Sequence, residues 1–196
     1  MYLNKNLERL KTIYTSMNQD ILYEDLMSPE SLREESALEF KEKLFEAKQR
    51  LQEKAATRKI NFPQVYGLEG YEAKLPSDEE LPQLFYMLEL TEDLIGTILK
   101  LPINRFNELS FKNIFQEPIS PKDTREYKEY VIHLHVESDY TFVSELFKEL
   151  TQKSYFIRPS LLQVRDLTGD LGEDHVGPQE IKIDLIVFKL VPEKKS

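Results

Sequence analysis

The chain has 196 residues and a formal net charge of −9, from 26 basic and 35 acidic side chains. This charge argues against nucleic-acid binding, which needs clustered Lys and Arg side chains to displace the counterions of the phosphates. The absence of cysteine excludes disulfides, thiol catalysis and zinc sites built on thiolates. No run approaches the roughly 18 apolar residues of a membrane-spanning helix, and a content of 40% hydrophobic residues predicts a soluble globular chain.

The first 59 residues show the alternating spacing of a coiled coil, with apolar side chains four and three residues apart. A first heptad seam consists of Leu3, Leu7, Leu10, Tyr14, Met17 and Ile21. Ser28 and Pro29 suit the start of a second helix, expected over residues 29–59. Its seam consists of Ala37, Phe40, Leu44, Ala47 and Leu51. A surface helix packed on its own domain also gives short seams, but we interpret residues 1–59 as a coiled-coil arm that contacts a partner.

Residues 60–76 contain two prolines and two glycines and break the helical periodicity, which predicts an irregular connector. A helix is expected over residues 77–100. Ser77 and Glu80 match a capping box at its start, and Pro102 follows its end.

Four strands and one more helix are predicted after this point. The strands are expected over residues 109–116, 127–137, 160–167 and 180–190, and the helix over residues 141–153. Ile132, Leu134 and Val136 alternate with polar residues, as the buried face of a strand does. From residue 77 the order αββαββ is a circular permutation of the ferredoxin-like βαββαβ order. We therefore expect an α+β fold, with a ferredoxin-like domain over residues 77–192 and a tail over residues 193–196.

His133, His135 and Glu137 are the candidate metal ligands, because residues two apart on a strand share a face. They resemble part of a two-His, one-carboxylate metal site. The alternative is that they form the polar outer face of a strand whose other face is core. A second candidate is the acidic stretch Asp166, Asp170, Glu173 and Asp174, but it lacks the EF-hand spacing, and a solvated hairpin loop explains it. We expect no catalytic residue and no cofactor.

The chain resembles the periplasmic parts of the inner-membrane platform proteins of type IV pili and type II secretion, of the PilO and GspM type. The resemblance rests on the heptad seams, on Gly67, Tyr71 and Pro76 before the helix at 77–100, on residues 130–150, and on the late strand KIDLIVFKLVP. It implies a non-catalytic structural role, with homodimers or heterodimers with a PilN-like or GspL-like protein. It also implies the periplasmic domain of a bitopic inner-membrane protein, anchored through a segment outside this chain.

Two other functions remain open from the sequence. Ferredoxin-like domains also serve as small-molecule-sensing regulatory modules, an alternative that rests on fold analogy alone. A metal-dependent enzyme using His133 and His135 is the other. We expect a scaffold protein that acts through dimerisation and binds no nucleic acid.

Overall fold

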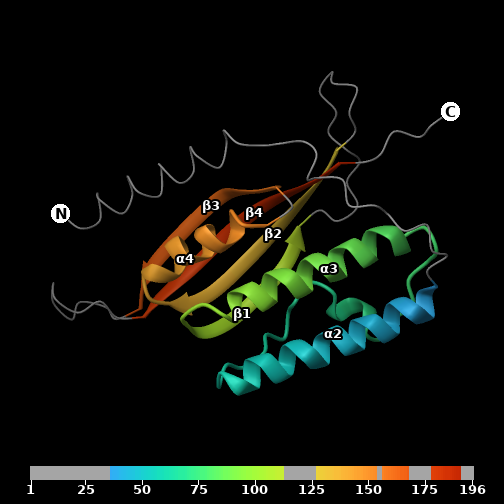
Figure 1. Ribbon diagram of the computed structural model, residues 1–196, viewed down its shortest axis with the longest axis horizontal. Helices are drawn as coiled ribbons and strands as arrows, with labels where there is room; N and C mark the ends of the chain where they lie inside the picture. Colours follow the sequence, from blue (N-terminus) through green and yellow to red (C-terminus); the bar gives the residue numbers. More distant parts are fainter. Residues whose placement is uncertain (1–35, 113–126, 154–155, 168–177, 191–196) are drawn as a thin grey trace.

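A computed structural model of the chain describes residues 36–112, 127–153, 156–167 and 178–190 (Figure 1). The first heptad seam, the Ser28–Pro29 pair, most of the acidic stretch and the tail lie outside the described residues. Those predictions therefore stay predictions.

A four-stranded antiparallel sheet forms the centre of the fold. Its strands are β1 (Ile103–Lys112), β2 (Tyr127–Ser138), β3 (Phe156–Asp166) and β4 (Gln179–Leu190). They lie side by side in the order β1-β2-β4-β3. This order results when the first strand of the βαββαβ ferredoxin-like unit is moved to its end. The predicted αββαββ fold class is confirmed.

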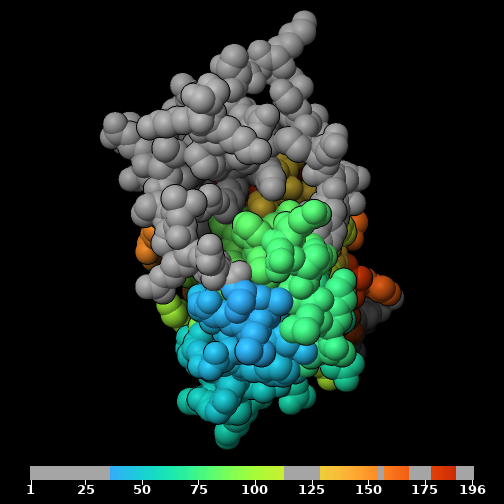
Figure 2. Space-filling model, turned by 90° about the vertical axis from the view of Figure 1, so that its right-hand side faces the viewer, coloured from blue at the N-terminus to red at the C-terminus, as the bar shows by residue number. Residues whose placement is uncertain are grey.

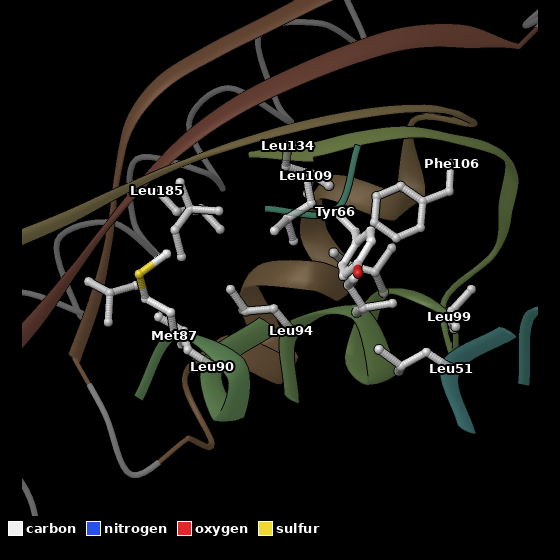
Figure 3. Close-up of a cluster of buried hydrophobic side chains, with 14 of the residues drawn as sticks. Leu51, Tyr66, Met87, Leu90, Leu94, Leu99, Phe106, Leu109, Leu134 and Leu185 are labelled. Carbon is white, nitrogen blue, oxygen red and sulfur yellow. The ribbon is translucent and has the colours of Figure 1, made fainter. Parts of the chain in front are cut away.

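Two helices, α3 (Leu81–Ile98) and α4 (Thr141–Leu150), supply the layer that covers one face of the sheet. Ile132, Leu134 and Val136 of β2 are fully buried on this face, as predicted. In Figure 3, Met87 and Leu94 of α3 lie below Leu134 and Leu185 of the sheet. The core therefore sits between the sheet and α3.

Helix α2 (Ala37–Thr57) packs on α3 and forms a third layer, as Figures 1 and 2 both show. Phe40 and Leu44 are fully buried, Leu51 is 2% exposed, and Ala37 packs against the same core. The prediction that this seam contacts a partner is wrong for these side chains, because they contact their own chain. The physical reason is that α3 buries side chains on more than one face, so its side away from the sheet needs a cover.

The start of α2 also differs from the prediction. Ser36 has an extended backbone, and its hydroxyl accepts a hydrogen bond from the Glu39 N–H at 3.1 Å. Ser36 is therefore the N-cap. The helix begins at Ala37 rather than at Pro29.

Strand β1 begins at Ile103, six residues before its predicted start at 109. The buried side chains of the strand are Ile103, Phe106 and Leu109, which are three residues apart instead of two. Register shifts between Ile103 and Arg105 and between Phe106 and Glu108 cause this spacing. A bulge adds a residue and resets which face the next side chain occupies, so the alternation that marks a strand is lost here.

Candidate functional site

The outer face of the sheet carries the candidate metal ligands. His133, His135 and Glu137 are each half-buried and alternate along β2 with the fully buried core residues. The structure therefore brings the three predicted side chains to one face of one strand. Their chemistry depends on the side chains that β1 and β4 place beside them.

His133 is paired across the sheet with Asp184 of β4. Its Nδ1 lies 2.6 Å from a carboxylate oxygen of Asp184, and Nζ of Lys112 donates to the same carboxylate at 3.0 and 3.1 Å. Burial alone would raise the pKa of Asp184, but the hydrogen bonds from His133 and Lys112 outweigh it and lower that pKa from its ordinary value. Asp184 is therefore an ionised carboxylate held between two donors.

His135 has a different partner, Glu180 of β4, whose carboxylate lies 3.0 Å from the His135 Nε2. Lys182 also contacts Glu180, at 3.1 Å, and its hydrogen bond is the main cause that lowers the pKa of Glu180. Glu137 has other partners. Its carboxylate accepts a hydrogen bond from the Asn107 amide at 3.3 Å and lies 3.4 Å from the Arg105 guanidinium.

The three candidate ligands are thus divided among separate ion pairs. A transition-metal site needs its ligands to converge on one point. Within the part of the chain that the structure describes, no group of three or more His, Cys, Asp or Glu side chains is placed to hold a metal ion. The geometry favours the alternative, in which these residues form a polar face stabilised by cross-strand pairs.

The connector holds a second polar cluster. The Tyr66 hydroxyl donates to Glu72 at 2.6 Å, and Lys48 of α2 contacts the same carboxylate at 2.7 Å. Burial and the neighbouring Glu72 carboxylate raise the pKa of Tyr66 strongly, so its hydroxyl stays protonated as a donor. Arg50 of α2 makes a two-point contact with Glu92 of α3, at 2.9 and 3.1 Å. These contacts fasten the connector and α2 to the domain, which is a structural role.

One apolar surface, the outer edge of β3, has no counterpart among the residues predicted from the sequence. Leu161, Val164 and Leu167 are 40%, 39% and 45% exposed, which is half of the large exposed hydrophobic side chains among the described residues. The sequence SLLQVRDL could have indicated this surface, because it combines several apolar residues with a predicted strand. That strand is the last one in the sheet order. We call these three side chains, with the backbone of β3 beside them, the β3 edge.

Residues 7–165 match the model of a protein family that is described as pilus-like. The chain belongs to this pilus-like family. The resemblance to pilus-associated proteins that the sequence suggested is confirmed, and a pilus-associated structural component is the function this membership supports. A comparison with curated proteins gives no match.

Solved structures share the fold. A crystal structure from Akkermansia muciniphila aligns with a TM-score of 0.71 at 14% identity, covering 97% of this chain and 99% of that one. A second Akkermansia muciniphila structure, described as being without transmembrane region, has a TM-score of 0.70 at 14% identity and covers 88% and 95% of the two chains. The type 4 fimbrial biogenesis protein PilO from Pseudomonas aeruginosa aligns at 18% identity over 74% of this chain and 98% of PilO, with a TM-score of 0.39 that is too low to argue from.

None of the helices in the described ranges combines the length and the hydrophobicity of a membrane-spanning segment.

Proposed function

We propose that the chain is a non-catalytic scaffold of a type IV pilus or type II secretion platform, which acts by dimerisation. The observation that carries this proposal is the match to the pilus-like family over residues 7–165. The partners that fit are a second copy of the chain and a PilN-like or GspL-like protein.

The geometry of the polar side chains supports a role without catalysis. Asp184 contacts Lys112 of β1, Glu180 contacts Lys182 of its own strand, and Glu137 accepts from the Asn107 amide of the neighbouring strand β1. A general acid or base has to reach a substrate atom, whereas these groups hold the sheet together. The exposed apolar side chains Leu161, Val164 and Leu167 suit contacts between proteins.

The place of action that we propose is the periplasm beside the inner membrane. One structural relative from Akkermansia muciniphila is described as being without transmembrane region. A domain of this fold next to a membrane anchor is consistent with a platform protein that bridges the membrane and the pilus machinery.

Deletion of the gene in the organism that encodes it tests this function. We expect fewer surface pili by electron microscopy, or loss of a secreted substrate. The wild-type gene should restore the phenotype, and an allele with Leu134→Asp should not, because that side chain is fully buried. Normal pili and normal secretion in the deletion strain would contradict the proposal.

A matched allele tests the enzymatic alternative. A gene carrying both His133→Ala and His135→Ala should restore pili as well as the wild type does. Loss of pili from this allele, with normal protein levels and fold, would point to chemistry at the two histidines.

A further inference from the structure

The outer face of the sheet has an apolar part beside its ion-paired part. Val131 of β2 and Ile186 and Phe188 of β4 lie on this face, because they alternate with the fully buried Ile132 and Val187. All three are half-buried, and Val131 is paired with Ile186 across the two strands. We call Val131, Ile186 and Phe188 the apolar platform.

Arg158 of β3 borders the apolar platform. It is paired with Ile186, and its guanidinium carbon lies 5.7 Å from the centre of the Phe188 ring. Its Nε is buried and has no hydrogen-bond partner among the described residues, whereas Lys112, at the other side of the platform, is bound to Asp184. A buried guanidinium N–H without an acceptor costs free energy. A carboxylate from outside the described residues would supply that acceptor.

The predicted first heptad seam ends with matching chemistry. Its last apolar residues are Tyr14, Met17 and Ile21, and Glu24 follows at the next step of the same alternating spacing. On a helix these four side chains share one face, so a carboxylate lies in line with an apolar stripe. An apolar surface bordered by an arginine is the complement of such a stripe.

The spacings of the two surfaces also agree. Along a helix, Ile21 and Met17 are about 4.5 and about 10.5 Å from Glu24. Neighbouring strands are about 4.8 Å apart, so the platform residues paired along the row of Arg158, on β4 and then β2, are about 5 and about 10 Å from it. A helix that crosses the strands along this row can therefore place its carboxylate at Arg158 and its apolar side chains on the platform.

The connection to α2 permits this contact. Phe40, near the start of α2, has its ring centre 5.4 Å from that of Phe85, and the ring of the next residue, Tyr86, lies 5.0 Å from that of Tyr130 in β2, directly beside the platform. α2 therefore starts at the end of the domain that carries the platform. Residues 25–36 can extend over about 40 Å, which exceeds three layer spacings of about 10 Å each between α2 and a helix on the outer face.

We propose that residues 14–24 dock on the apolar platform of their own sheet, with the Glu24 carboxylate bound to the Arg158 guanidinium. α2 already uses its seam to cover the core of its own chain, and this contact covers the opposite face of the sheet. The inference goes beyond the proposed function, because it assigns the first seam to a contact within the chain. A partner that binds this seam has to displace it from the sheet.

Cross-linking within the full chain tests the contact. The sequence has no cysteine, so Asp25→Cys with Ser160→Cys introduces the only two thiols and keeps Glu24 and Arg158. Ser160 is exposed. We expect a short bis-maleimide to join the two thiols in a product that runs as a monomer on a denaturing gel and gives one linked peptide after trypsin digestion. Asp25→Cys with Gln52→Cys, which is exposed on α2, is the matched control and should give at most a tenth of that product.

Charge reversal tests the ion pair. Arg158→Glu in the double-cysteine background opposes two carboxylates and should reduce the cross-link about tenfold, with an unchanged circular dichroism spectrum. Adding Glu24→Arg restores opposite charges and should restore the cross-link. Arg165→Glu, which changes an exposed arginine on the same strand, should leave the cross-link unchanged.

The outcomes are separate from those of the proposed function. A cross-link between two chains overturns the inference, because the platform then binds a second copy. Equal products at residues 160 and 52, or failure of Glu24→Arg to rescue Arg158→Glu, also overturn it. Normal pili in the deletion strain would contradict the proposed function and leave this contact standing.

Discussion

Gly67 of the connector lies against the aromatic ring of Phe111 in β1, so closely that a Cβ atom on Gly67 would be 2.7 Å from two ring carbons. Its φ of +94° is in the region that favours glycine. The contact holds the connector beside the β1 edge, next to the bridge between Val65 and Glu108. It explains why one edge of the sheet is closed by the chain itself.

Gly67→Ala should lower the free energy of unfolding by about 1–3 kcal/mol, because alanine is strained at this φ and its methyl group displaces the Phe111 ring. Urea denaturation measures the change. Gly70→Ala is the control, since nothing lies within 4 Å of its Cβ position and its φ is not positive. Equal stability of the two variants would contradict the close packing.

Leu134→Asp should prevent folding, because it buries an unpaired charge at a cost of several kcal/mol. His133→Ala, one residue away on the outer face, should leave the fold intact and cost about 1–2 kcal/mol for the lost contact to Asp184. Circular dichroism measures whether each variant is folded, and thermal melting measures its stability. A folded Leu134→Asp protein would mean that the faces of β2 are reversed.

Leu44→Ala should destabilise the protein by about 2–5 kcal/mol, since this fully buried side chain joins α2 to the core. Its neighbour Phe45 is 49% exposed, and Phe45→Ala should change the free energy of unfolding by no more than about 0.5 kcal/mol. If both substitutions are neutral in urea denaturation, α2 is an independent arm after all.

Asp184→Asn should cost about 1–2 kcal/mol at pH 7, because the carboxylate is hydrogen-bonded by His133 and Lys112. The pKa of Asp184 is lowered in the folded protein. Its contribution to stability is therefore present above the unfolded-state pKa of about 3.9 and is lost as the pH falls through the lower folded-state pKa. Urea denaturation from pH 7 to pH 3 should show the wild type approaching the variant. A difference that grows as the pH falls below the unfolded-state pKa of about 3.9 would contradict this assignment.

The order of elements was predictable because most strands and helices carry a clear period. The strands at residues 127–137 and 180–190 differ from β2 and β4 by only one residue. The start of β1 was not predictable, because two register shifts space Ile103, Phe106 and Leu109 three apart. Bulges depend on the partner strand and leave no period in the sequence.

The misassignment of α2 has a physical cause as well. A heptad seam looks the same whether it packs on a partner or on its own domain. The deciding signal lies in α3, where Leu88 and Leu90 are both buried although they lie about 200° apart around the helix. A helix that is apolar on several sides needs cover on several sides, and that pattern predicts a covering helix.

For the candidate site, alternation along β2 was enough to predict that His133, His135 and Glu137 share a face. Their partners were not predictable. Asp184 lies 51 residues from His133 in the sequence, and only the register between β2 and β4 brings them together.

Sedimentation equilibrium of the full chain tests the central claim most directly, because a scaffold that acts through dimerisation has to self-associate or pair with a partner. The account predicts a concentration-dependent dimer, or a complex with a purified PilN-like or GspL-like protein. A strict monomer at every concentration, which also fails to bind a purified PilN-like or GspL-like protein, would contradict it.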